Sequence, residues 1–195
     1  MEPEEDKPGG RKPRADSLRN RARLLAAARE VFSEGGAGAS LEAVAQRAGV
    51  GIGTLYRHFP TREALFQAVY RNEVDQLVAL AARLKTEAPP VEALRLWLRA
   101  AIDMAATKKG MIAALVPAPT PDLYADSGAR TMAAAEALMA RAASAGAIRD
   151  DLSSRDLMMT LFGMCHLQGQ PGWRENVARL VDVFVDGLSS PAATG

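Results

Sequence analysis

The sequence predicts an all-α protein, because its composition, its periodicity and its turn residues all favour helix. Alanine occurs 38 times, against 12 valines and 4 isoleucines, and alanine loses no side-chain entropy in a helix whereas β-branched residues do. Apolar residues recur in steps of three and four, and Gly or Pro separates the stretches. We expect nine helices, arranged as a three-helix head on a larger helical body.

The composition excludes several classes of protein. With 195 residues, 48% of them hydrophobic, the chain can bury a substantial core. Its single cysteine cannot form an internal disulfide, and neither a glycosylation sequon nor an apolar leader indicates secretion. No apolar run approaches the roughly 20 residues of a membrane span. We therefore expect a cytoplasmic protein that does not enter a membrane.

Charge is unevenly distributed along the chain, although the net charge is only +1. Residues 1–10 sum to −3, residues 11–60 to +5 and residues 61–195 to −1. A positive segment confined to one part of the chain is expected where that part alone meets a polyanion.

The chain is expected to open with a disordered arm and a first helix. Residues 1–15 combine Pro, Gly and dense charge with almost no apolar side chains. Asp16 or Ser17 can cap the first helix, which ends at the glycine pair that starts with Gly35.

A helix, a tight turn and a second helix follow within about 20 residues. Ser40 is suited to cap a short helix that breaks at Gly49, and a second short helix runs to Pro60. We therefore assign residues 16–60 to the head.

The body is assigned to residues 61–188, with residues 189–195 as a frayed tail. Its apolar stripes and its Pro or Gly breaks place the helices. The expected body helices cover residues 61–86, 91–108, 111–116, 122–145, 153–167 and 173–188.

The most informative segment runs from Ser40 to Phe66. Small residues at the start of its second short helix keep the tip narrow enough for a major groove, and the polar residues behind the tip can reach phosphate oxygens. Ile52, Leu55 and Phe59 alternate with these polar residues and form the expected inner face.

This segment resembles the N-terminal domain of the TetR family of bacterial transcriptional regulators. The resemblance is carried by the Ser cap, by A-x-x-A-G-V at 45–50, by G-T-L-Y-x-H-F at 53–59 and by R-E-x-L at 62–65. It implies that Tyr56 and His58 clamp phosphates and that Ser40 and Arg62 join them. Base-edge or further phosphate contacts are implied for Gly51, Gly53, Thr54 and Arg57. The family usually has Ser at position 51, so glycine removes one potential hydrogen bond.

The stretch 116–157 is similar to the C-terminal domain of an SbtR-like branch of the same family. It begins with a Pro-rich entry, continues with an alanine-rich helix and ends in GAIRDDLSSRDL. The resemblance implies a repressor that responds to a small-molecule effector of no fixed chemical class.

Methionine and aromatic residues of the body fill either an irregular core or an adaptable pocket. Because TetR-like bodies hold a cavity among their middle helices, the resemblance implies an effector pocket, and core filling remains the alternative. The candidate lining residues are Trp97, Met104, Tyr124, Phe162, Cys165 and His166.

The last two helices carry apolar faces broader than packing against one body requires. The resemblance implies a four-helix interface in a homodimer, and plain monomer core is the alternative. The candidates are Leu157, Leu161, Met164, Val177, Leu180, Val181, Phe184 and Val185.

The chain shows no arrangement typical of an enzyme or a metal site. Cys165 and His166 are neighbours that diverge by about 100° on a helix, so they cannot pair as nucleophile and base. Two histidines and one cysteine offer no zinc spacing. The glycines at 49–53 follow no strand and precede no Gly-Lys-Ser/Thr. We expect no catalytic activity, no metal and no cofactor.

We therefore expect a ligand-responsive repressor that binds a palindromic operator in double-stranded DNA as a dimer and is released by a small molecule. An activator with the same head would differ only in promoter context. The alternative is a helical small-molecule carrier or protein-interaction module without DNA binding. Arg11, Lys12 and Arg14 could reach a minor groove or could be a solvated charge run.

Overall fold

The computed structural model describes residues 12–34, 39–114, 121–165 and 171–189. These ranges hold eight α-helices and no strand, with one isolated bridge between Ile148 and Ser189. The all-α class is therefore confirmed. The helices are α1 (Lys12–Glu34), α2 (Leu41–Ala48), α3 (Ile52–His58), α4 (Arg62–Glu87), α5 (Pro90–Ala114), α6 (Pro121–Ser144), α7 (Ser154–Cys165) and α8 (Trp173–Leu188).

The predicted count of nine helices is one too high for the described part of the chain. A break was expected at Lys108 to Gly110, with a separate helix at 111–116, but α5 continues through these positions to Ala114. The reason is tertiary packing. Met111 is completely buried in the core of the head, and this burial outweighs the low helix propensity of one glycine.

The first helix begins at Lys12, before the expected start at Asp16 or Ser17. Pro13 then stands in the first turn, where a missing N–H costs nothing. Residues 12–15 of the predicted arm are therefore helical, and residues 1–11 lie outside the described residues. At the other end, Ser189 pairs with Ile148, and residues 190–195 also lie outside them.

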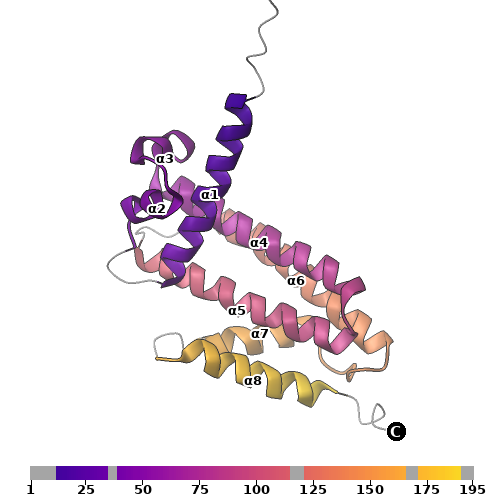
Figure 1. The fold of residues 1–195 in the computed structure, drawn as a ribbon. Coiled ribbons are helices and arrows are strands. Elements are labelled where there is room, and N and C mark those ends of the chain that lie inside the picture. The colour runs from indigo at the N-terminus through magenta and orange to yellow at the C-terminus, as the bar shows by residue number, and fades with distance from the viewer. Residues whose placement is uncertain (1–11, 35–38, 115–120, 166–170, 190–195) are drawn as a thin grey trace, which may run out of the picture.

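Caps and one left-handed glycine fix the head. The Ser40 hydroxyl accepts the Ala43 N–H at 3.1 Å and starts α2, and Gly49 ends α2 with φ of 65°. The Thr61 hydroxyl accepts the Ala64 N–H at 3.1 Å and starts α4. Figure 1 shows α2 and α3 side by side near the crossing of α1 and α4.

The head core extends into the body. Its buried side chains come from α1, α2 and α3 and also from α4 and α5, where they include Val69, Tyr70, Val74 and Met111. The second core lies among α4, α5, α6, α7 and α8. Partly buried Val78 and Met104 pack against both cores, so head and body are joined by apolar contact.

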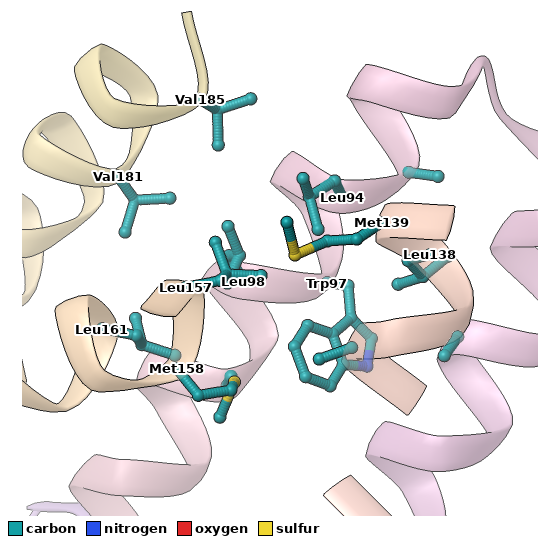
Figure 2. Close-up of a cluster of buried hydrophobic side chains, with 14 of the residues drawn as sticks. Leu94, Trp97, Leu98, Leu138, Met139, Leu157, Met158, Leu161, Val181 and Val185 are labelled. Carbon is teal, nitrogen blue, oxygen red and sulfur yellow. The ribbon is translucent and has the colours of Figure 1, made fainter. Parts of the chain in front are cut away.

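The body is a helical layer with α4, α5 and α6 alongside one another and α7 and α8 packed against α5 (Figure 1). Figure 2 shows Trp97 of α5 beside Leu138 and Met139 of α6. The Trp97 side chain is completely buried, and its Nε1–H donates to the Leu77 carbonyl at 3.0 Å.

Ion pairs join α8 to α5. Arg95 contacts Asp182 at 3.2 Å and Asp186 at 2.5 Å, and Arg99 contacts Asp182 at 2.6 Å.

None of the described helices is long and apolar enough to cross a membrane.

Candidate nucleic-acid interface and internal cavity

Helix α3 presents one buried and one exposed face. Leu55 and Phe59 are buried, as the sequence predicted, and the Arg21 guanidinium of α1 lies 5.4 Å from the Phe59 ring centroid. Tyr56 is 45% exposed. Ile52 was expected on the inner face, but it is 39% exposed because it stands at the tip of the helix. An aliphatic side chain there can contact a thymine methyl group.

The glycines of α3 leave its tip open. A Cβ added at Gly51 or at Gly53 would meet no atom within 4 Å, apart from the residue's own local backbone. Both residues are exposed. The backbone of the tip can therefore approach another molecule closely.

Arg57 is folded back on its own helix. Its Nη2 donates to the Thr54 hydroxyl at 3.0 Å, and its Nε donates to the Gly53 carbonyl at 3.3 Å. Thr54 and Arg57, two of the four residues for which base-edge or further phosphate contacts were predicted, therefore contact each other, and a change at Thr54 removes one of the two hydrogen bonds that hold Arg57. His58 is half-buried at the end of α3, next to Phe59.

A polar group stands at the start of α2, where Glu42 follows the Ser40 cap. Hydrogen bonds from its own backbone N–H and from Ser40 hold the pKa of the Glu42 carboxyl below its usual value, and the nearby Arg62 charge adds to this effect. Ser40 and Arg62, both predicted phosphate contacts, thus both act on the Glu42 carboxyl. Sequence reasoning missed Glu42, although an acid in the first turn of a capped helix is a known signal.

The body contains a cavity of about 570 Å³, a size typical of small-molecule sites. Tyr70 reaches it from α4, and the other lining residues form stripes on α5, α6 and α7. They are Ala101, Met104, Ala105, Lys108, Lys109, Gly128, Thr131, Met132, Met158, Leu161, Phe162 and Cys165.

Three of the six predicted pocket residues, Met104, Phe162 and Cys165, line this cavity. Trp97 does not: it belongs to the core and is not among the lining residues. Tyr124 stands in α6, but the structure does not describe its side chain. His166 lies outside the described residues. Sequence reasoning missed Tyr70, Lys108 and Lys109, because helical periodicity does not separate a cavity wall from a core.

Tyr70 belongs to both the cavity wall and the head core. Its ring stacks on Phe66, with centroids 6.3 Å apart and an interplanar angle of 28°. Both residues lie on α4, one turn apart, and Phe66 is buried among the head residues. The cavity is therefore one side chain away from the core that holds α2 and α3.

A second contact between head and body is an ion pair. Arg29 Nε of α1 donates to Glu73 Oε2 of α4 at 3.1 Å, and Glu73 Oε1 makes no hydrogen bond within the described part of the chain. Burial raises the pKa of the Glu73 carboxyl, the Arg29 charge opposes that rise and Asp103 adds to it. A buried carboxylate held by one arginine makes the α1–α4 contact sensitive to changes in packing.

Five of the eight predicted interface residues are buried within the subunit. These are Leu157, Leu161, Val177, Val181 and Val185, and Figure 2 shows four of them in the body core, all except Val177. Their burial places them in the monomer core, which was the alternative. Met164 and Phe184 are half-buried, and Leu180 is 43% exposed.

The exposed large apolar residues of α7 and α8 include only one of the predicted eight, Leu180. Met159 and Phe162 of α7 are exposed, as is Val183 of α8, which is 70% exposed. With Leu180 they form the four-residue set that we call the α7–α8 apolar face. Sequence periodicity did not single out these exposed positions, because each helix carries apolar residues outside its buried stripe as well as within it.

Comparisons with known proteins identify the class. One family model, described as bacterial regulatory proteins of the tetR family, matches residues 24–69. Another, described as the C-terminal domain of SbtR-like transcriptional regulators, matches residues 89–190. The helix-turn-helix head and the cavity-bearing body are thus the two parts of a DNA-binding transcriptional regulator. The second model alone covers more than half of the sequence, and the chain belongs to the TetR family.

Solved structures agree. A TetR transcriptional regulator from Streptomyces coelicolor is 46% identical, and the match covers 88% of this chain and 99% of that one, with a TM-score of 0.78. A TetR regulatory protein from Mycobacterium vanbaalenii is 35% identical, with coverage of 91% and 99% and a TM-score of 0.71.

Curated relatives match over shorter lengths. UidR of Escherichia coli is 43% identical over 60 residues, which are 30% of this chain and 31% of UidR. RutR of Escherichia coli is 33% identical over 96 residues, 49% of this chain and 45% of RutR. The chain therefore spans less than half the length of these two relatives.

Among the residues that the structure describes, no three His, Cys, Asp or Glu side chains gather to hold a metal ion.

Proposed function

We propose that the chain is a ligand-responsive repressor that binds a palindromic operator as a homodimer and is released when a small molecule occupies the cavity. The observation that carries this proposal is the position of Tyr70. Its ring is part of the cavity wall and also part of the head core. A ligand that displaces Tyr70 therefore acts on the core that positions α3. Such a repressor works in the cytoplasm, on chromosomal DNA.

Helix α3 is the element proposed to enter the major groove. Its exposed glycines leave room for the backbone of the tip to approach the bases, and Thr54 and Arg57, which contact each other, are proposed to meet base edges. Tyr56 and His58 are proposed to bind phosphates, together with Ser40 and Arg62. Because phosphate contacts supply most of the affinity, binding should weaken steeply as salt is raised.

The proposed homodimer forms through the α7–α8 apolar face. Isolated exposed apolar residues are normal on a protein surface, but this face places four large ones on two adjacent helices. A two-fold axis between subunits would present two copies of α3 to major grooves about 34–36 Å apart. The operator is then a palindrome whose half-site spacing follows from the protein.

Release requires that the ligand prefers a conformation in which the two heads no longer match that spacing. The coupling is typically about 1–3 kcal/mol, and a ligand with equal affinity for both conformations releases nothing. Tyr70 and the Arg29–Glu73 ion pair are the contacts through which a shift of α4 would reach the head.

Selection of bound sequences from random duplexes tests the proposal directly. A repressor enriches a palindrome, whereas a carrier or interaction module that has kept the fold enriches nothing. Failure to enrich any duplex at low salt, in protein free of small molecules, would contradict the proposal.

Variants of α3 test the docking. Tyr56→Phe and His58→Ala should weaken binding to operator and to random DNA together, whereas Thr54→Ala and Arg57→Ala should change the enriched sequence. Lys85→Ala, on the exposed last turn of α4, is the control that should change neither. Equal small effects from all four α3 variants would count against this docking.

A further inference from the structure

The last turn of α1 is held by a residue that lies far away in the sequence. Arg174, in the first turn of α8, donates from Nη2 to the Ser33 carbonyl at 2.8 Å. The two residues are 141 positions apart, and in Figure 1 the start of α8 lies near the end of α1. This hydrogen bond therefore joins the last helix of the body to the first helix of the head.

The end of α1 needs a donor of this kind. The last carbonyls of a helix have no N–H partner within that helix, and they form the negative end of its dipole. The last turn of α1 contains no basic residue of its own. Arg174 supplies both a donor and a positive charge. Its side chain is half-buried, and its guanidinium carbon lies 5.8 Å from the Trp173 ring centroid, which restricts its movement.

The same end of α1 is also bound to the helix-turn-helix. Arg47 of α2 donates through both Nη atoms to the Glu34 carboxylate at 3.2 Å and through one of them to Glu30 at 3.0 Å. A contact through both Nη atoms fixes the relative direction of the two side chains. A displacement of the end of α1 relative to α8 therefore also displaces α2.

Helix α8 connects this point to the proposed subunit interface. Leu180 and Val183 of the α7–α8 apolar face lie on α8, and Asp182 between them pairs with two arginines of α5. Arg174 and Leu180 are six residues apart, roughly 9 Å along the helix axis. A single helix held on the body therefore extends from the interface to the end of α1.

We propose that Arg174 is a positioning residue that fixes the orientation of each head relative to the two-fold axis, and thereby the half-site spacing that the dimer accepts. Apolar packing of α1 on α5 holds the head on the body, but the hydrophobic effect has no preferred direction. The hydrogen bond at the end of α1 has one. This inference rests on the proposed homodimer, and it concerns a contact separate from the cavity and from Tyr70.

Spin-label distance measurements on the full chain test the orientation without DNA. The label is attached to a ketone-bearing amino acid placed at Gln46, an exposed position of α2, so that Cys165 is left unchanged. Two fixed heads give one narrow distance distribution, which Arg174→Met should broaden. Arg149→Met is the matched control, because Arg149 contacts Asp151 within the same loop, and it should change nothing. An equally narrow distribution in Arg174→Met overturns the inference.

A conservative variant tests whether the hydrogen bond is the cause. Arg174→Lys keeps a charged donor on a more flexible stem. Its distance distribution should be broader than that of the wild type and narrower than that of Arg174→Met. The lysine variant also keeps the test valid if the methionine variant does not fold. A lysine variant as broad as the methionine variant overturns the role of the hydrogen bond.

Operator spacing gives a second readout. One base pair is inserted at the centre of the palindrome enriched by selection, which moves one half-site by about 3.4 Å and turns it by about 35°. This should weaken wild-type binding by about tenfold or more. Arg174→Met should lose about two- to tenfold at the original spacing, the contribution of one hydrogen bond, and should lose much less than the wild type on insertion. Loss by the same factor at both spacings overturns the inference.

The two readouts separate this inference from the proposed function. A broadened distribution in Arg174→Met, with no palindrome enriched by the wild type, supports the positioning role and contradicts operator binding. An enriched palindrome, with distances and spacing preference unchanged in Arg174→Met, supports the repressor and overturns the role of Arg174. Wild-type monomers in sedimentation velocity contradict both.

Discussion

Gly49 provides the sharpest test of how the head is built. It ends α2 in the left-handed region, with φ of 65° and ψ of 38°. An added Cβ would lie 2.6 Å from Arg23 Nη2, the far end of a flexible side chain that can swing away. The main cost of Gly49→Ala is therefore conformational, about 1–2 kcal/mol for a residue with a Cβ in this region.

Thermal unfolding measures this cost. For a chain of this size, 1 kcal/mol moves the melting temperature by about 2–4 °C, so Gly49→Ala should melt about 2–8 °C below the wild type. Gly53→Ala is the matched control, because it lies within α3 and a Cβ there meets nothing within 4 Å. Alanine favours helix over glycine, so this control should melt at or above the wild-type temperature.

The comparison can fail in a clear way. If Gly49→Ala and Gly53→Ala melt within 1 °C of each other, the turn between α2 and α3 does not depend on a left-handed residue. Gly49→Asn should lie between them, since Asn tolerates the left-handed region better than Ala does.

Three further predictions concern the body. Burial raises the pKa of Glu73, so the folded chain keeps that proton to higher pH than the unfolded chain and the wild type loses stability as pH rises between the two pKa values. The melting temperature of Glu73→Gln relative to wild type should therefore rise from about pH 4.5 to about pH 7.5, and a relative fall would contradict this. Trp97→Ala should lower the free energy of unfolding in urea by about 3–5 kcal/mol, because it empties a fully buried site; a loss near zero would remove Trp97 from the core. Leu180→Glu combined with Val183→Glu should give monomers in sedimentation velocity at micromolar concentration, and unchanged dimers would exclude the α7–α8 apolar face.

Local signals in the sequence were sufficient for most helix boundaries. The hydroxyl of Ser40 caps α2 as predicted, and that of Thr61 caps α4 at the start of the predicted body. Ser153 receives the Asp156 N–H at 3.2 Å and donates to the Asp156 carboxylate at 2.6 Å, so it caps α7. Such caps depend on residues within one turn, which sequence reasoning sees directly.

The errors arose where distant packing decides the outcome. The predicted break near Gly110 does not occur, because Met111 is buried by the head, more than 40 residues away in sequence. The same limit applies to the sites. Trp97 is of a residue type that suits a pocket, and only the fold, which buries it completely in the body core, shows that it does not line the cavity. Lysine is a residue type typical of the surface, and only the fold brings Lys108 to the cavity.

The shared core has a consequence for protein engineering. Suppose that residues 16–60 alone were replaced by the head of a relative. The new head would then pack on side chains that differ from those of its own body, namely Val69, Tyr70, Val74 and Met111. A functional hybrid regulator would therefore have to take three parts from the same relative. These are the DNA-binding helices, the first half of α4 and the turn of α5 that contains Met111. Altering which operator the chain reads is therefore better done on the outer face of α3 than by exchanging whole segments.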